Sequence, residues 1–594
     1  MTVPRHVFGY AGRTEFGLLS TPDLIYKMQW IFKEYDPDQL LIFSRSLGLD
    51  PLYGKLLLTR NIVTQKQLDE YFNPTPDKLH DPFLMKDLEK AILRIQQALT
   101  GGEKILVYGD YDVDGITSAS VLYLFFKKMG GDICYYIPDR EKEGYGLSRE
   151  GLDHAASQGV SLIITCDCGI NAVDKVRYAN QKGLDVIITD HHEPSLELPP
   201  ALAIVNPKQN DDTYPEKNLC GAGVAFKLIQ GYCRYENLDE ELAYDYLDLV
   251  ALGTAADIVN MTGENRILMS EGLRKINSGK NRIGLKALMD VSRIRPEEMD
   301  VSKIVFGIAP RLNAVGRLGE ASRAVKLLTT LDPDEAKTYS EILDDENTQR
   351  RVIEKDVMEE AIRIIEKRYS RKLPKILILH NSTWHPGVIG IVASKIKERY
   401  HRPVIMIAFQ DNLGKGSGRS ITGFDLYGAL HVHEKWLQSY GGHVMAAGLT
   451  ISKENLGRFI RDLHKFAEDT ISPDILEPRI YIDAEVEMEQ INMELLTFLD
   501  RLRPFGPGNM RPKFCLRNVQ PQRASIVGGN HLKFRARKNH VSLDCIAWNF
   551  GEDLPLVSES HKAVDLVFVP SINDWNGTRS IQLIVKAIKS HEQA

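Results

Sequence analysis

Short apolar runs alternate with helix-length segments between residues 104 and 207. The runs read KILVYGD, DICYYIP, SLIITCD, DVIITDHH and ALAIVNP, with few polar positions inside each. Strands that are buried on both faces have this near-continuous apolar composition, and strands separated by helices pair in parallel. The pattern therefore predicts a parallel β-sheet that is covered by helices on both faces.

Three other patterns follow along the chain. From Gly221 to about Leu331 the spacing is mainly helical. The highly charged, glycine-free stretch 333–369 predicts one connecting helix about 55 Å long. KILILH, GVIGIVASKIKERY, PVIMIAF and DLYGALHVHEKWL predict a second, smaller α/β block. From about Pro473, short strand-like runs broken by Gly, Pro and Asn predict a small β-barrel.

Composition adds limits to this picture. A chain of 594 residues is too long for one core, so we expect several domains. No apolar stretch approaches the ~20 residues of a membrane span, and the first residues lack the pattern of a signal peptide. Seven scattered cysteines predict reduced thiols and a cytoplasmic protein. Cys166 and Cys168 have no second pair for a zinc site, so we expect them to pack in the interior.

The net charge of −6 gives no sign of a nucleic-acid partner, but it hides a local excess of positive charge. Residues 501–540 contain ten Lys or Arg and no Asp or Glu, with Phe505, Phe514 and Phe534 among them. Proteins of the OB type hold single strands by backbone charge and by stacking bases on aromatic rings. This segment therefore predicts an OB-like surface for single strands, with a solvated basic face as the alternative.

Acidic and histidine side chains gather where the predicted strands end. They are Asp110, Asp112, Asp114, Asp167, Asp190, His191 and His192, and Asp257 lies in the helical run YLDLVALGTAADIV. Ligands bind at the carboxyl ends of the strands in such a sheet. Carboxylate and imidazole donors without thiolates favour Mn²⁺ or Mg²⁺, and the number of carboxylates favours two ions about 3.5–4 Å apart.

Each part of this set has another interpretation. GDYDVDG resembles a calcium loop, but Val121 stands where such a loop needs glutamate. TDHHE alone could be a solvated turn, and Asp167 could cap the helix that follows it. The coincidence of ligand-type residues at three strand ends favours the metal site.

Several motifs resemble a known family. GDYDVDG, TCDCGIN, TDHHE and ALGTAADIV resemble, in this order, the four motifs of the DHH phosphoesterases, and GGHVMAAGLTI (441–451) resembles the motif of their DHHA1 domain. PDREKEGYGLS (138–148), PRLNAVGR (310–317), HPGVIGIVASKI (385–396) and GSGRS (416–420) resemble the family's single-strand-specific exonucleases in particular. The likeness runs from about residue 80 to the end. It implies a metal-dependent 5′→3′ exonuclease that hydrolyses phosphodiester bonds of single-stranded DNA in DNA repair and recombination.

The resemblance also implies a division of this α/β multidomain chain. The segments would be an N-terminal appendage (1–75), a parallel-sheet DHH catalytic domain with a helical subdomain (76–332), a connecting helix (333–370), a smaller α/β DHHA1 domain that binds substrate (371–472), and an OB-like β-barrel that binds nucleic acid (473–594). Single-stranded DNA is the expected partner, with a helicase and a single-strand-binding protein as further partners and a monomeric state. No membrane is expected.

Roles for single residues follow from the same likeness. Asp112, Asp114, Asp167, His191 and Asp257 would hold two Mn²⁺ or Mg²⁺ ions, with Asp167 bridging them and Asp110 either binding an ion or supporting a ligand. His192 would lie beside the scissile phosphate, and Asp190 would orient the histidines. Many relatives have a histidine where this chain has Tyr108, so the first ion would have one protein ligand fewer.

Substrate contacts are expected from charged and small residues in the remaining motifs. They are Arg140, Arg311, Arg317, Ser417, Arg419, Ser420 and His443. Two alternative functions stay open. One is a DHH phosphodiesterase for short oligonucleotides or cyclic dinucleotides, and the other is a non-catalytic DNA-binding replication scaffold. An inorganic pyrophosphatase would lack the basic β-rich tail.

Overall fold

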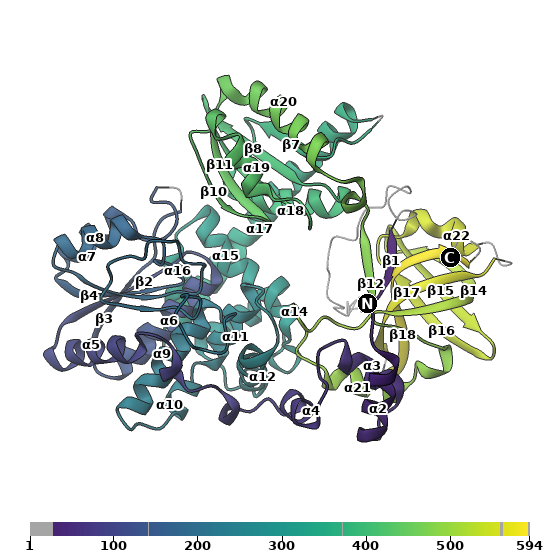
Figure 1. The fold of residues 1–594 in the computed structure, drawn as a ribbon, viewed down its shortest axis with the longest axis horizontal. Helices are drawn as coiled ribbons and strands as arrows, with labels where there is room; N and C mark the ends of the chain where they lie inside the picture. Colours follow the sequence, from purple (N-terminus) through teal and green to yellow (C-terminus); the bar gives the residue numbers. More distant parts are fainter. Residues whose placement is uncertain (1–27, 141, 371, 559–561, 576, 592–594) are drawn as a thin grey trace, which may run out of the picture. The chain divides into compact units, whose positions relative to one another are not determined.

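The computed structural model describes residues 28–591 except 141, 371, 559–561 and 576 (Figure 1). The chain forms two compact units. Unit 1 comprises the N-terminal segment up to Gln65, Arg350–Arg501 and the segment from Arg511 onward, and unit 2 comprises Lys66–Gln349 with Leu502–Met510. None of the described helices combines the length and the apolar composition that a membrane span requires.

Unit 2 is built around a parallel sheet of five strands. These are β2 (Lys104–Gly109), β3 (Asp132–Tyr136), β4 (Val160–Cys166), β5 (Asp185–Thr189) and β6 (Ala203–Val205), in the order β3-β2-β4-β5-β6. In Figure 1, α7 (Arg149–Ser157) and α8 (Val173–Gln181) lie on one side of this sheet. On the other lie α5 (Leu88–Gly101), α6 (Val113–Lys128) and α9 (Gly221–Tyr235). The predicted parallel sheet with helices on both faces is confirmed.

Alternate residues of β2 show why the sheet needs both helical layers. Ile105 and Val107 pack into the core beneath α5, α6 and α9, whereas Leu106 and Tyr108 pack into a separate core with α7 and α8. Successive side chains of a strand point to opposite faces, so a strand between two layers is apolar at nearly every position.

Helices make up the rest of unit 2, as the sequence predicts. They are α4 (Gln65–Phe72), α10 (Glu241–Tyr244), α11 (Leu247–Ala256), α12 (Gly263–Asn277), α13 (Ile283–Ser292), α14 (Val301–Lys303), α15 (Ala309–Leu318) and α16 (Ser322–Thr329). A single π-helical turn, Ile304–Ile308, joins α14 to α15. The long helix α17 runs from Pro333 to Arg368, which is about 54 Å for its 36 residues. The predicted connecting helix is thus confirmed.

The second α/β block lies in unit 1. Its strands are β7 (Leu377–Asn381), β8 (Val404–Gln410), β9 (Leu413–Arg419), β10 (Ser439–His443) and β11 (Ala446–Ser452), in the order β10-β11-β9-β8-β7. Only β7 and β8 pair in parallel. The helices are α18 (Pro386–Tyr400), α19 (Leu426–Val432) and α20 (Lys453–Thr470).

The C-terminal part of unit 1 is a closed barrel. Its strands are β14 (Phe514–Val527), β15 (His531–Lys538), β16 (Val541–Ala547), β17 (Val564–Trp575) and β18 (Thr578–Ser590), and pairing of β14 with β17 closes it. The short strand β13 (Ala484–Glu485) pairs in parallel with β14. Two helices, α21 (Met493–Arg501) and α22 (Leu554–Ser558), flank the strands. The predicted OB-like barrel is confirmed.

Two of the three aromatic residues expected to stack on bases lie inside this barrel. Phe514 and Phe534 are fully buried, so that expectation is wrong for both. Along β15, Leu532, Phe534 and Ala536 point inward, and the basic residues between them point outward. The period of two in the strand separates the apolar from the charged positions.

The N-terminal segment adds a small element to unit 1. Strand β1 (Gln29–Phe32) pairs in parallel with β12 (Arg479–Ile482), and α2 (Pro37–Leu47) and α3 (Pro51–Leu58) follow it. Residues 1–27 of the expected appendage lie outside the described residues.

Candidate metal centre and strand-binding surface

The acidic and histidine residues meet at the carboxyl ends of β2, β4 and β5 and the end of α11. Their donor atoms form three overlapping groups, in each of which all donor atoms lie within 4.8 Å of one another: Asp110, Asp112 and Asp167; Asp114, His191 and Asp257; and Asp167, His191 and His192. Asp167 and His191 each belong to two groups. The structure therefore brings together every ligand candidate that the sequence suggested.

Two helix N-termini hold the aspartates that follow β2. Asp112 caps α6, and its Oδ1 accepts hydrogen bonds from the amides of Asp114 (3.0 Å) and Gly115 (3.1 Å). Asp114 accepts from the first amides of α9, with Oδ2 2.6 Å from Gly221 N and Oδ1 2.8 Å from Ala222 N. These amides stabilise negative charge, so both carboxylates are fixed in place.

Glycine is required where these helices approach the cluster. A Cβ added at Gly115 would lie 2.6 Å from the backbone nitrogen of Asp110, and one at Gly221 would lie 2.7 Å from the Cβ of Asp167. Any side chain at either position would displace an aspartate.

Asp190 holds the two histidines. Its Oδ1 lies 2.8 Å from Nδ1 of His192 and accepts the amide of His191 (2.7 Å), and its Oδ2 accepts the amide of Ile170 (2.9 Å). His191 Nε2 lies 3.0 Å from Asp167 Oδ1. Asp190 therefore contacts the ring of His192 and the backbone of His191, and Asp167 contacts the ring of His191.

Tyr145 is a neighbour of His192 that the sequence did not single out. Its hydroxyl lies 3.3 Å from His192 Nδ1 and 3.2 Å from the Asp167 carbonyl oxygen, and its ring is exposed. The residue lies in PDREKEGYGLS, in which Arg140 is the more conspicuous charged residue. Within the motif, the tyrosine stands between Gly144 and Gly146, and this local pattern could have indicated an exposed functional residue.

Burial of several like charges dominates the electrostatics. The pKa of Asp167 is raised by burial and then by the charges of Asp114, Asp112 and Asp110. Burial raises the pKa of Asp114 to about 6 and that of Asp257 to about 8, and in both cases neighbouring carboxylates add to the shift. A bound cation would remove this mutual repulsion.

The donor set fits Mn²⁺ or Mg²⁺. Asp110 is buried, and its Oδ1 has no hydrogen-bond partner among the described residues. An unpartnered buried carboxylate oxygen is costly unless a cation or water binds it. Oxygen and imidazole donors without a thiolate favour these two metals. Cys166 and Cys168 are buried and unbridged, as expected for packing residues.

The two histidines have opposite protonation preferences. Burial alone would lower the pKa of His192, but the hydrogen bond and charge of Asp190 outweigh it and raise the pKa to about 9. Burial and the charge of His192 lower the pKa of His191 to about 3. A neutral His191 can act as a ligand, and a protonated His192 can donate.

Tyr108 does not face the cluster. It is fully buried in the core of α7 and α8, where its hydroxyl accepts the amide of Ser148 (3.1 Å) and lies 3.2 Å from the Gly146 carbonyl oxygen. The residue at the expected histidine position therefore anchors the loop that carries Tyr145.

The expected phosphate contacts of unit 2 differ in their surroundings. Arg140 is exposed and lies over the ring of Tyr111, 5.1 Å from its centroid. Arg317 directly follows Gly316 on α15, where an added Cβ would lie 2.6 Å from the Tyr111 carbonyl oxygen. Both cations thus lie beside the metal loop, which we define as residues 110–113.

Arg311 is held inside unit 2. Its Nε lies 2.7 Å from Asp344 Oδ1, and its Nη1 donates to the Gly307 carbonyl oxygen at 2.6 Å. The guanidinium therefore links α15 to α17 in this conformation.

The predicted contacts in the DHHA1-like block belong to unit 1. Residues Arg419 and His443 are both opposite Ala446 in register, on β9 and β10. Arg419 Nη1 donates to Ser417 Oγ at 3.1 Å, and His443 is exposed. Ser420 is buried, and its hydroxyl donates to the Phe424 carbonyl oxygen at 2.7 Å, so this donor is already used within the domain.

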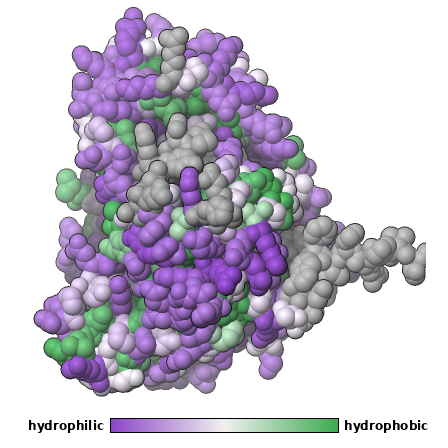
Figure 2. Space-filling view, turned by 90° about the vertical axis from the view of Figure 1, so that its right-hand side faces the viewer, coloured by the Kyte–Doolittle hydropathy of each residue, from purple (hydrophilic) through white to green (hydrophobic). Residues whose placement is uncertain are grey.

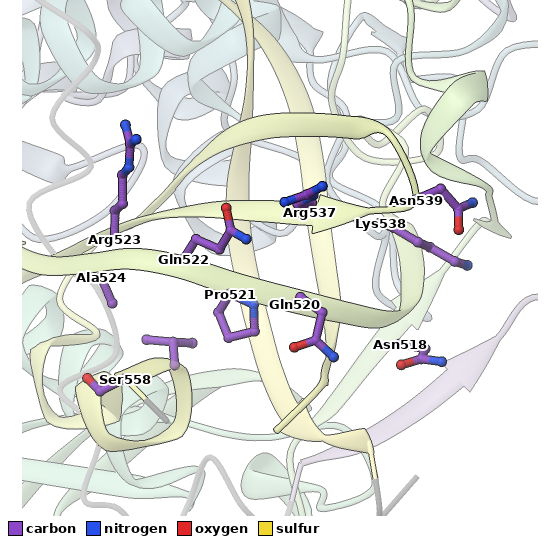
Figure 3. Close-up of a pocket in the computed structure, with 11 residues that line it drawn as sticks. Asn518, Gln520, Pro521, Gln522, Arg523, Ala524, Arg537, Lys538, Asn539 and Ser558 are labelled. Carbon is purple, nitrogen blue, oxygen red and sulfur yellow. The ribbon is translucent and has the colours of Figure 1, made fainter. Parts of the chain in front are cut away.

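The barrel carries a basic outer face on β14 and β15. Lys533, Arg535 and Arg537 are exposed, and Gln522 and Gln520 lie opposite the two arginines in register. A cavity of about 600 Å³ opens here, with β14 and β15 on one side and α22 on the other (Figure 3). Its lining comprises Asn518, Gln520, Pro521, Gln522, Arg523, Ala524, Arg537, Lys538, Asn539, Val557 and Ser558, without a carboxylate.

The basic stretch 501–540 does not form one surface. Residues 502–510 belong to unit 2, where Arg503 lies 3.6 Å from Asp300. An exposed aromatic residue that the sequence did not single out is Trp548, which contacts the His531 ring edge-on at 4.8 Å between centroids. The face of the molecule shown in Figure 2 is mostly hydrophilic, with apolar residues in small separate groups.

Comparison with known proteins agrees with this architecture. The family model described as DHH family, N-terminal domain, matches residues 104–254, the DHHA1 domain matches 373–469, and the RecJ OB domain matches 482–587. The single-stranded-DNA-specific exonuclease RecJ of Bacillus subtilis is 38% identical over 567 residues, which are 95% of this chain and 71% of that relative. This chain belongs to the RecJ family.

Other RecJ proteins extend the likeness. RecJ of Escherichia coli K12 is 36% identical over 561 residues, which are 91% of this chain and 96% of that relative. Two crystal structures of RecJ from Thermus thermophilus also match. The complex with Mn²⁺ has a TM-score of 0.81 at 29% identity, covering 95% of this chain and 80% of that one. The complex with Mg²⁺ has a TM-score of 0.77 at 28% identity, covering 95% and 78%. The family resemblance and the order of domains predicted from the motifs are confirmed.

Proposed function

We propose that this chain is a metal-dependent exonuclease that degrades single-stranded DNA from its 5′ end in DNA repair and recombination. The observation that carries the proposal is the buried cluster of aspartates and histidines at the carboxyl ends of β2, β4 and β5. Its donors suit the metals found in RecJ of Thermus thermophilus, and RecJ relatives are named as single-stranded-DNA-specific exonucleases.

Two groups of donors would hold two cations. In this proposal one group is Asp110, Asp112 and Asp167, and the other is Asp114, His191 and Asp257. Asp167, which also forms a donor group with His191 and His192, would be shared by the two cations. When bound, divalent cations neutralise the anionic phosphate and make a nearby water molecule acidic enough to act as a nucleophile. The protein contributes the fixed carboxylates, since the helix N-termini and Asp190 hold the donors before substrate binds.

His192 is the proposed acid. Asp190 engages Nδ1, and Nε2, which lies 3.5 Å from the Tyr145 hydroxyl, is the nitrogen proposed to face the substrate. Because the pKa of His192 is raised to about 9 by Asp190 against the opposite effect of burial, the ring carries a proton at neutral pH. A protonated imidazole beside the scissile phosphate can donate to an oxygen that gains charge as the bond breaks.

Cations and hydroxyl donors outside the cluster would hold the strand. We propose Arg140 and Arg317 beside the metal loop, and Ser417, Arg419 and His443 in the DHHA1-like block, as phosphate contacts. Arg311 could reach a phosphate only by releasing Asp344. The outer face of β14 and β15 would bind the strand further from its end by charge, with Trp548 as a stacking surface.

The segment boundaries 76–332, 333–370, 371–472 and 473–594 are part of the same proposal. So are a monomeric state, a helicase and a single-strand-binding protein as partners, and a cytoplasmic location. These rest on family resemblance and composition.

One assay tests the proposal. A single-stranded DNA labelled separately at each end is incubated with the full chain and Mn²⁺, Mg²⁺ or EDTA. We expect mononucleotide release from the 5′-labelled strand with either metal and none with EDTA. Cleavage of dinucleotides but not of long strands would instead support a short-oligonucleotide phosphodiesterase, and binding without cleavage under every condition would support a scaffold.

A further inference from the structure

One face of α15 covers the metal loop. Asn313 Oδ1 accepts the amide of Val113 at 3.2 Å, and a Cβ added at Gly316 would lie 2.6 Å from the Tyr111 carbonyl oxygen. Residues three and four positions apart lie on the same side of a helix. Residues 313 and 316 therefore form one face that meets the segment carrying Asp110 and Asp112.

The hydrogen bond from Val113 completes the N-terminus of α6. The first amides of a helix have no partner within it. Asp112 Oδ1 accepts the amides of Asp114 and Gly115, the Asp112 carbonyl oxygen accepts that of Ile116 at 2.8 Å, and the amide of Val113 remains. Asn313 satisfies it. Asp112 therefore uses only one carboxylate oxygen for the helix, and Oδ2 is left for a cation.

The sequence of α15 breaks local helix preference at these positions. Asn and Gly are both poor residues for a helix interior. The helix also follows a π-helical turn, Ile304–Ile308, a feature that frequently occurs at functional sites. Violations of local preference gathered on one face indicate a functional constraint.

Other residues of α15 anchor the helix. Arg311 bonds to Asp344 and to the Gly307 carbonyl oxygen, and Leu312 and Val315 are fully buried. A helix held in this way presents Asn313 as a rigid acceptor rather than a mobile surface amide.

We propose that Asn313 is a positioning residue of the metal centre, which sets the orientation of the Asp112 carboxylate by holding the amide of Val113. The motif PRLNAVGR thereby acts through the metal loop in addition to any contact with the substrate. This inference rests on the proposed function, because it assumes that the aspartate cluster binds divalent cations.

The test compares Mn²⁺ binding by the full chain and three variants. Asn313→Leu keeps the size of the side chain but removes the acceptor, and Asn313→Asp keeps an acceptor. Asn277→Leu is the matched control, because Asn277 is a half-buried helical asparagine of the same unit that donates to the Met299 carbonyl oxygen. Mn²⁺ affinity is measured by calorimetry and by electron paramagnetic resonance of free Mn²⁺, and thermal melting reports folding.

We expect Asn313→Leu to weaken Mn²⁺ binding about 10- to 100-fold, as loss of a partner that orients a metal ligand does in other proteins. Hydrolysis by this variant should recover at high Mn²⁺. Asn313→Asp should bind Mn²⁺ more tightly than Asn313→Leu, and Asn277→Leu should bind as the wild type does. Gly316→Ala, which disturbs the same face, should weaken binding in the same direction.

Wild-type affinity in a folded Asn313→Leu variant would overturn the inference. So would an equal loss of affinity in Asn277→Leu, because the effect would then be general destabilisation. Asp167→Ala distinguishes a failure of the positioning role of Asn313 from a failure of the metal centre itself. If that variant loses Mn²⁺ binding while Asn313→Leu keeps it, only the positioning role fails. If Asp167→Ala binds Mn²⁺ normally, the metal centre itself is wrong.

Discussion

The metal centre buries negative charges next to one another, whereas the outer face of the barrel exposes positive charges to solvent. Asp110, Asp114 and Asp167 are each at most 3% exposed and belong to one cluster of donor atoms. The cations of β15 are exposed, and Arg535 has an acid partner, Asp544, at 3.0 Å. Charges interact strongly where water is excluded and weakly at an exposed surface.

This difference predicts how each region responds to change. In the metal centre the carboxylates act on one another, and Asp112, Asp114 and Asp190 are also held by backbone amides. Single substitutions should therefore have large and non-additive effects. On the barrel each exposed cation acts almost independently, so effects should be small and should add. In the proposed function both regions would bind parts of one substrate, but only the metal centre would require fixed geometry.

The largest effect is expected for Asp167→Ala. Asp167 is shared by two donor groups, so its loss should weaken binding of both cations and reduce hydrolysis by about 100- to 1000-fold or more. Binding of single-stranded DNA should change little. Hydrolysis is measured in single-turnover reactions and binding by fluorescence anisotropy.

Asp174→Ala is the control for this variant, because Asp174 is an exposed aspartate on α8 that pairs with Arg177. It should behave as the wild type does. Full nuclease activity in Asp167→Ala would show that the aspartate cluster is not the metal centre that hydrolysis requires.

The next effect is expected for His192→Gln. Loss of a proton donor at the scissile phosphate typically reduces the rate about 100-fold or more. Mn²⁺ affinity should stay near that of the wild type, since the proposed cation ligands do not include His192. Calorimetry measures Mn²⁺ affinity, and single-turnover kinetics measures the rate of hydrolysis. His154→Gln, at an exposed histidine, is the control. A loss of Mn²⁺ binding as large as that of Asp167→Ala would make His192 a ligand instead.

The sequence predicts most of the metal centre, because parallel strands bring their carboxyl ends to one edge. Asp110, Asp167 and His191 follow three strands that pair in the order β2-β4-β5, so their meeting requires only the correct sheet. The hydrogen bonds of Asp114 with Gly221 and Ala222 join residues more than a hundred positions apart in the sequence, and they depend on where α9 begins. No local pattern contains that information.

On the barrel, the alternation of residues along β15 carries more information than composition does. HLKFRAR alternates apolar and basic residues, which already places Phe534 on the inner face and Lys533 and Arg535 on the outer face. The expectation that Phe534 stacks on bases is inconsistent with this alternation, which places Phe534 inside the barrel. The position of Phe514 inside the barrel and the exposure of Trp548 depend on how the strands close, which composition does not show.

A smaller effect is expected when basic residues of β15 are replaced. The double variant Lys533→Ala, Arg537→Ala should weaken binding of a long single strand. It should also reduce the slope of log affinity against log salt by about 0.7 for each phosphate that the protein no longer neutralises. Cleavage of a strand too short to reach the barrel should be unchanged. Affinity is measured over a range of salt concentrations.

The double variant Arg274→Ala, Arg295→Ala is the charge-matched control, because it removes two exposed arginines of unit 2 that pair with Glu271 and Glu298. An unchanged salt slope in the double variant would show that this face of the barrel does not hold the strand. A fall in cleavage of the short strand would show that the two regions are not independent.

The smallest effect concerns a buried carboxyl group of the barrel domain that no cation is proposed to bind. Asp553 is 3% exposed, and its Oδ2 has no hydrogen-bond partner within the described part of the chain. Burial, with the charge of Glu552, raises the pKa of Asp553 to about 6 from 3.8. The protonated form is thus favoured by the fold, so its contribution to stability is present below about pH 4 and is lost as the pH rises through 6.

Asp553→Asn should therefore stabilise the protein at pH 8 by up to about 3 kcal/mol and have little effect at pH 4. Thermal unfolding and hydrogen exchange of barrel amides at both pH values measure this difference, with the exposed Asp574→Asn as control. Equal stability of Asp553→Asn and wild type at pH 8 would mean that Asp553 has a compensating partner. Because this carboxyl group lacks the surrounding aspartates and fixed amides of the metal centre, its burial should affect stability alone and leave Mn²⁺ binding unchanged.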